Sequence, residues 1–170
     1  MPIAYDVLES ALAAAMDTYL RQLVAQVDPK DLYVVGLYTS GELSYLSPTA
    51  NTRSAIAISP YSPWSPPDWV LHLGLAESFQ PVEDVLAAGW TEDFETFEID
   101  EARVRGSIHH LLRSARQRYF GETDIVVGLF MGDMGHPWVE ASVTAINPPE
   151  IARTFSLGLR RRTISRDHQE

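Results

Sequence analysis

The sequence predicts a single α+β domain, in which two β-hairpins form a mixed or antiparallel sheet with helices packed against it. Two apolar, β-rich runs with nearby turn signals predict the hairpins, and stretches of helical periodicity lie before, between and after them. A length of 170 residues suits one domain with a substantial core. We place the domain at residues 1–160 and expect residues 161–170 to form a polar, frayed tail.

The first helix is predicted over residues 3–27. Asp28-Pro29 ends it, because the residue before a proline disfavours helical geometry. The Ala-rich part of this stretch lacks a basic start and is interrupted by acids, which favours an amphipathic helix over a signal peptide. Its apolar side chains recur on one helical face, at Leu8, Leu12, Ala15, Tyr19, Leu23 and Val27.

The first hairpin joins a run at residues 32–38 to a shorter run at residues 43–46, across the turn signal Ser40-Gly41. The first run shows little alternation of apolar and polar residues. It therefore predicts a central strand that is covered on both faces. Asn51-Thr52 stands where a helix cap is expected, and residues 51–59 predict a short helix.

Prolines between residues 60 and 67 exclude regular structure from the next segment, and Trp64 and Trp69 indicate an ordered loop. Residues 79–88 predict a further helix that Gly89 ends.

Glu92 to Glu101 is interpreted as an acidic loop that carries two phenylalanines and runs into a long helix, which Gly121 caps. The runs Ile125 to Met131 and Trp138 to Ala145 predict the second hairpin. Asn147-Pro148-Pro149 then opens a last helix.

The two predicted hairpins share a short motif. Val34-Val35-Gly36-Leu37 in the first is repeated as Val126-Val127-Gly128-Leu129 in the second. Strands draw on a small set of residues, so chance explains the identity as well as an internal duplication does. The sequence leaves that choice open.

The negative charge of the chain belongs to one segment. No Lys or Arg lies between Arg53 and Arg103, an interval that holds ten acids, and the 13 acids elsewhere are balanced by 13 bases, giving the net charge of −10. Duplex binding needs the opposite sign, so nucleic acid is excluded as the expected ligand. No apolar run reaches the ~20 residues of a membrane span, and we expect a cytoplasmic protein.

The chain has no cysteine, which excludes disulfides, thiolate metal sites and cysteine nucleophiles. His109 and His110 are adjacent on a helix and point about 100° apart, so they do not share a metal as an i, i+4 pair would. We expect no metal, no cofactor and no catalytic residues. Whether the protein is an enzyme stays open, although the residues favour a non-enzymatic role.

Four short motifs follow one another along the chain: Tyr33 to Thr39, Pro48 to Thr52, Trp64 to Asp68, and Ile146-Asn147-Pro148. In this order they resemble a bacterial family of uncharacterised proteins, Domain of Unknown Function 4303. The resemblance covers most of the chain and implies the family's fold and compartment. It implies no catalytic residues, because no activity is established for that family.

The acidic, aromatic segment is the strongest functional candidate. A solvated loop with two core-anchoring phenylalanines is the simpler interpretation. The functional interpretation is a face that engages a basic protein, with acids that speed encounter and aromatic rings that anchor it. This predicts an immunity or inhibitor protein that blocks a bacterial toxin. The residues predicted to bind the partner are Glu92, Asp93, Phe94, Glu95, Phe97, Glu98, Asp100 and Glu101.

Three alternatives remain. One is an enzyme or small-molecule binder with a pocket near Tyr38, Trp64, Asp133 and His136, because a carboxylate can orient an imidazole. Another is a structural subunit that dimerises through a hairpin edge. The third is anion binding at Asn51-Thr52-Arg53, although a plain helix cap explains these residues.

Overall fold

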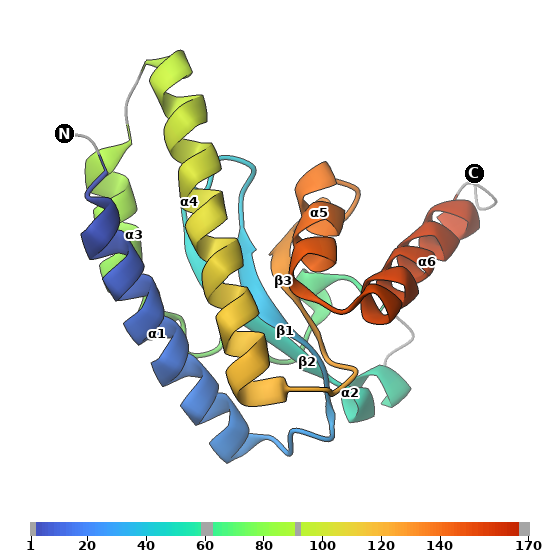
Figure 1. The fold of residues 1–170 in the computed structure, drawn as a ribbon. Helices are drawn as coiled ribbons and strands as arrows, with labels where there is room; N and C mark the ends of the chain where they lie inside the picture. Colours follow the sequence, from blue (N-terminus) through green and yellow to red (C-terminus); the bar gives the residue numbers. More distant parts are fainter. Residues whose placement is uncertain (1–2, 59–62, 91–92, 167–170) are drawn as a thin grey trace.

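The computed structural model describes residues 3–58, 63–90 and 93–166, with the backbone alone from residue 160 onward. Over these residues the chain forms one α+β domain, in which helices pack on a three-stranded mixed sheet (Figure 1). The strands are β1 (Leu32–Thr39), β2 (Leu46–Thr52) and β3 (Val126–Met131). The helices are α1 (Tyr5–Gln26), α2 (Arg53–Ile58), α3 (Gln80–Gly89), α4 (Phe94–Ala115), α5 (Pro137–Ile146) and α6 (Pro149–Arg166).

The sheet has the order β2-β1-β3, with β1 antiparallel to β2 and parallel to β3. The first hairpin and the central position of β1 are therefore confirmed. Every residue of β1 except Tyr38 is buried, which explains why its sequence does not alternate. The second strand begins later than predicted, at Leu46 rather than Leu43, and it includes Pro48. Pro48 is tolerated because β2 is an edge strand of the sheet.

The repeated motif lies side by side in the two parallel strands. Val34 pairs with Val126 and Gly36 pairs with Gly128, so the identical residues are in register. Both glycines make room for neighbouring side chains. A Cβ on Gly128 would lie 2.9 Å from Cγ2 of Val143 and 3.0 Å from the Phe130 ring. Close packing where the two strands meet therefore explains why both of them carry glycine at the paired position.

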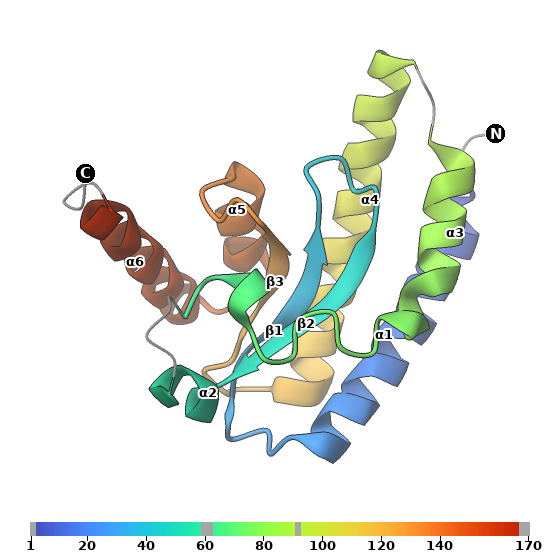
Figure 2. The ribbon, with the colours of Figure 1, turned by 180° about the vertical axis from the view of Figure 1, so that it is seen from behind.

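Two apolar clusters cover the two faces of the sheet. One unites α1, α3 and α4 with strand residues such as Leu37 and Leu129. The other unites α5, α6 and Trp69 with strand residues such as Val126 and Phe130. Figure 1 shows α4 in front of the sheet, and Figure 2, seen from behind, shows the segment between α2 and α3 crossing the opposite face. That segment contains 3-10 helices at Pro66–Asp68 and Ala76–Phe79.

The predicted second hairpin is wrong. β3 is followed by helix α5 where a strand over residues 138–145 was expected. Pro137 occupies the first turn, and the Nδ1 atom of His136 accepts a hydrogen bond from the Trp138 amide at 3.3 Å. The buried residues Val139, Val143 and Ile146 then follow at helical spacing. The β-branched composition of this stretch suggested a strand, but its period is that of a helix.

The prediction of an acidic loop from Glu92 to Glu101 is also wrong, because α4 begins within that range, at Phe94. Asp93 is the N-cap of α4, and its Oδ2 atom accepts a hydrogen bond from the Thr96 amide at 2.9 Å. The last helix opens at Pro149 as predicted, and its backbone stays helical to Arg166.

Candidate functional site

A cavity of about 410 Å³ opens at the end of the sheet where β1 and β3 begin. Its walls come from four parts of the chain that are distant in sequence: the strand starts, α2, the segment at Pro63, and the first turns of α6. The volume lies within the range typical of small-molecule sites. The lining residues are Tyr33, Arg53, Ile56, Pro63, Trp64, Asp124, Val126, Glu150, Ile151 and Thr154.

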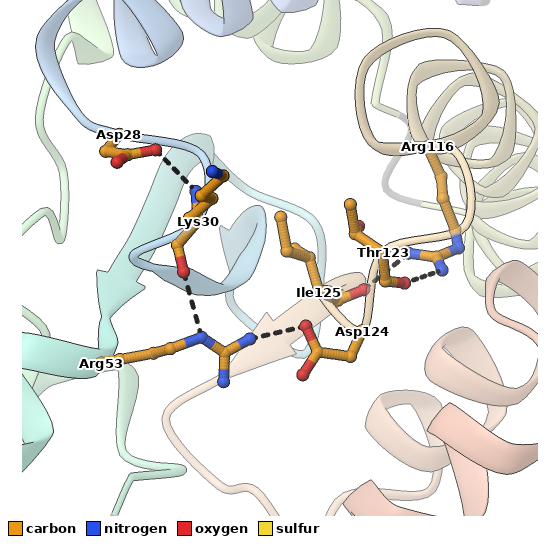
Figure 3. A network of polar contacts seen from close by, with 7 residues as sticks. All are labelled: Asp28, Lys30, Arg53, Arg116, Thr123, Asp124 and Ile125. Atoms are coloured by element: carbon orange, nitrogen blue, oxygen red, sulfur yellow. Dashed lines mark hydrogen bonds and ion pairs between the residues drawn. The ribbon is translucent and has the colours of Figure 1, made fainter.

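Arg53 lines this cavity, and Figure 3 shows its polar contacts. Its Nη2 atom lies 2.6 Å from Oδ1 of Asp124, and its Nε donates to the carbonyl of Lys30 at 3.3 Å. Among the described residues, none accepts a hydrogen bond from Nη1, which points away from both contacts in Figure 3. The two contacts hold the guanidinium of Arg53 against Asp124 and the Lys30 carbonyl.

Arg116 fixes the segment that presents Asp124. This arginine is only 3% exposed and belongs to a π-helical segment, Arg116–Phe120, at the end of α4. Its guanidinium donates to the carbonyl of Ile125 at 2.6 Å and to that of Thr123 at 2.9 Å (Figure 3). Burial lowers the pKa of Arg116, and the charge of Glu150 opposes that effect.

Two aromatic rings form one wall. Tyr33 and Trp64 meet edge to face at 5.5 Å between ring centroids, and Trp64 also packs edge to face on Phe155 at 4.8 Å. The Tyr33 hydroxyl donates to the carbonyl of Pro63 and accepts from Nδ2 of Asn51 at 3.0 Å. Burial raises the pKa of Tyr33, so its ring stays neutral. These contacts hold both rings in place before any ligand arrives.

Of the residues predicted for the alternative pocket, only Trp64 lines this cavity. Tyr38 lies at the opposite end of β1, where its ring packs edge to face on His72 at 4.6 Å. Asp133 accepts a hydrogen bond from the Gly135 amide at 2.9 Å, and His136 packs on Trp138 at 5.0 Å. Each of these three side chains therefore has a local structural role.

Most residues of the cavity were not predicted from the sequence. Asp124 and Glu150 belong to no motif, Tyr33 was noted only as the start of a family-like motif, and only the fold brings the three residues together. Arg53 was considered as part of an anion site at the start of a helix. The cap interpretation of that stretch is supported, because Oγ1 of Thr52 accepts from the Ala55 amide at 3.2 Å.

The acidic candidates divide into structural and exposed residues. Asp100 accepts a hydrogen bond from the Tyr5 hydroxyl at 2.5 Å, and Glu101 pairs with Arg105 at 2.6 Å. Phe97 packs on Trp90 at 5.0 Å between ring centroids, as a core anchor would. Asp93 caps α4, and its bonds with Thr96 lower its pKa. Glu92 lies outside the described residues.

What remains on the surface is a compact group on the first turns of α4. We call it the α4 tip: Phe94, Glu95, Glu98 and Ile99. All four side chains are exposed, with Phe94 at 72% and Ile99 at 64%. The bond between Tyr5 and Asp100 brings the start of α1, with its exposed acid Asp6, to the same end of the molecule as the start of α4 (Figure 1). Ile99 was not among the residues that the sequence predicted for this surface.

Comparisons with family models, with curated proteins and with solved structures gave no match. The family resemblance therefore stays a prediction that depends on four short motifs. Across residues 3–58, 63–90 and 93–166, no helix is long and apolar enough to cross a membrane. The same residues contain no group of three or more His, Asp or Glu side chains arranged to hold a metal ion.

Proposed function

We propose that the protein is a non-enzymatic binding protein that engages a basic protein through the α4 tip. The observation that carries the proposal is the exposure of two large apolar side chains, Phe94 and Ile99, among carboxylates. Exposed apolar groups surrounded by charge are typical of interaction surfaces. The fold offers no internal reason for these two side chains to face water.

The four tip residues share one side of α4. Positions 94, 95, 98 and 99 are related by one and four residues, so they form a stripe about one and a half turns long. Phe94 and Ile99 supply apolar contact area, and Glu95 and Glu98 supply negative charge. This pattern is complementary to a surface that places basic side chains around an apolar patch.

Helix stability accounts for only part of this acidity. Acids in the first turn stabilise a helix through its macrodipole, and Asp93 and Glu95 occupy such positions. Glu98 lies beyond the first turn, and Asp6 belongs to another helix. A surplus of negative charge at this end speeds encounter with a basic partner. A bacterial toxin with a basic cleft is the concrete partner we propose, which makes this chain an immunity or inhibitor protein.

The test compares two matched variants as baits in native lysate. The tip variant carries Phe94→Ala, Glu95→Gln, Glu98→Gln and Ile99→Ala. The control variant removes the same chemistry elsewhere, with Ile58→Ala, Val70→Ala, Glu42→Gln and Glu122→Gln, all at exposed positions. Asp93 stays unchanged in both variants because it caps α4.

We expect wild type and the control variant to capture the same basic protein at low salt, and the tip variant to lose it. The purified pair should then weaken steeply as salt rises to about 0.5 M, because screening shortens the reach of surface charges. Equal capture by the tip variant, or binding that salt leaves unchanged, would contradict the proposal.

A further inference from the structure

We propose that the cavity between β1, β3 and α6 binds a small organic amine. The protonated amine lies at Glu150, and an apolar body lies against the rings of Tyr33 and Trp64. The site is separate from the α4 tip, which lies at the other end of the molecule (Figure 1). The two proposals therefore stand or fail independently.

The cavity has the size and surface for such a ligand. Its volume of about 410 Å³ accommodates a molecule built on one aromatic ring. Ile56, Val126 and Ile151 give it apolar walls, and the two aromatic rings complete them. Polar side chains reach the cavity at few positions, which is typical of sites that orient a ligand through one or two contacts.

The charge of the lining favours a cation. Three charged side chains reach the cavity, and Arg53 and Asp124 neutralise each other at 2.6 Å. The third, Glu150, has no ion-pair or hydrogen-bond partner for its carboxylate among the residues that the structure describes. The charge of Arg116 interacts with that of Glu150, but Arg116 does not line the cavity. The lining thus carries one surplus negative charge.

The aromatic wall adds to this preference. The face of a Tyr or Trp ring is negative and attracts an ammonium group, especially where water is partly excluded. The contacts of Tyr33 with Pro63 and Asn51 hold that ring rigidly. A preformed wall reduces the entropy that binding must overcome. A carboxylate beside two aromatic rings is the combination that an organic ammonium ion prefers over a neutral or anionic ligand.

Three probes that each carry a phenyl ring on a short chain and differ in charge test the proposal by isothermal titration calorimetry. They are phenethylamine, which is cationic, 2-phenylethanol, which is neutral, and 3-phenylpropionate, which is anionic. We expect phenethylamine to bind about tenfold more tightly than 2-phenylethanol, a difference of about 1.4 kcal/mol, and 3-phenylpropionate to bind most weakly.

Two variants assign the binding to this cavity. Glu150→Gln should weaken phenethylamine about tenfold and leave 2-phenylethanol unchanged, because only the charge is lost. The matched control is Glu77→Gln, an exposed carboxylate outside the cavity. Thr154→Trp should block all three probes by filling the space. Its control, Arg153→Trp, places the same ring at an exposed neighbouring position that does not line the cavity.

Circular dichroism confirms that each variant is folded before titration. Three results would overturn the proposal: no heat from phenethylamine at about 10 mM, an anionic probe that binds as tightly as the cationic one, or equal affinity in wild type and Glu150→Gln.

Discussion

The carboxamide of Asn147 makes two hydrogen bonds with the backbone of Val127. Its Oδ1 accepts from the Val127 amide at 2.9 Å, and its Nδ2 donates to the Val127 carbonyl at 2.6 Å. Ser142 Oγ accepts from the Leu129 amide at 2.7 Å in the same way. β3 has β1 on only one side, so these side chains satisfy backbone groups that a fourth strand would otherwise bind.

We predict that Asn147→Ala lowers the free energy of unfolding by about 2–4 kcal/mol. The substitution leaves a buried amide and a buried carbonyl without partners, and each such group costs about 1–3 kcal/mol. Urea unfolding followed by circular dichroism measures the change. Thr144→Ala, at an exposed position of the same helix, is the control and should change stability by less than about 0.5 kcal/mol. Equal stability of the two variants would show that water replaces Asn147 at the strand edge.

We predict opposite effects of the same substitution at two glycines. A Cβ on Gly36 would lie 2.0 Å from the carbonyl oxygen of Gly128 and 2.7 Å from the ring of Phe130. Gly36→Ala should therefore destabilise the fold by about 3 kcal/mol or more, because backbone and core must move. Thermal unfolding measures both variants.

The matched substitution is Gly106→Ala in the exposed middle of α4, where nothing lies within 4 Å of the added Cβ. It should stabilise the protein by about 0.5–1 kcal/mol, because alanine has the higher helix propensity. A destabilising Gly106→Ala would contradict this prediction.

The elements that sequence predicted well are those whose local pattern and tertiary role agree. The buried run of β1 and the periodic stripe of α1 are examples, because burial dictates both patterns. α5 was missed because its valines favour strands, while its helical period and Pro137 favour a helix. A count of the spacing between Val139, Val143 and Ile146 would have found it.

The candidate site was less predictable, for a physical reason. The lining of the cavity joins positions 33, 53, 124 and 150, which no sequence motif connects. Their proximity follows from the parallel pairing of β1 with β3, and the sequence did not predict the order of the strands. The acidic segment was visible because charge is counted along the chain. Which of its residues cap a helix, form ion pairs or stay exposed depends on their positions on α4, and the segment was predicted to be a loop.

Arg116 should be more important for stability than its neighbours on α4. Its guanidinium is buried and donates to the carbonyls of Thr123 and Ile125. We predict that Arg116→Met lowers the free energy of unfolding by about 2–4 kcal/mol, because the buried carbonyl of Ile125 loses its donor and the part-buried carbonyl of Thr123 loses a second. Arg116→Lys should rescue only part of the loss, since one ammonium group lacks the fork of the guanidinium.

The control for Arg116 is Arg113→Met. Arg113 also donates two hydrogen bonds to a backbone carbonyl, that of Ala145, at 3.1 and 2.7 Å, but it is exposed. Water can replace those bonds, so the expected change is less than about 1 kcal/mol. A similar loss in both variants would mean that the number of bonds, and not burial, sets the cost.

His109 predicts a pH dependence of stability. Its Nε2 atom is buried and has no hydrogen-bond partner among the described residues. Burial lowers the pKa of His109 below the ordinary value of 6.5, and the charges of Arg105 and Arg113 lower it further. The unfolded chain therefore takes up a proton near pH 6.5 that the native chain resists. Stability is fully present above about pH 6.5 and falls as the pH drops toward the native pKa.

Urea unfolding at about pH 7.5, 6.5 and 5.5 measures this slope, and His109→Gln should flatten it. Some slope should remain, because burial also lowers the pKa of His72, whose Nδ1 lies 3.2 Å from Oγ1 of Thr49. The double variant His72→Gln/His109→Gln should flatten it further. If His109→Gln keeps the wild-type slope, or if wild-type stability rises on acidification, the native imidazole is protonated and must have found an acceptor.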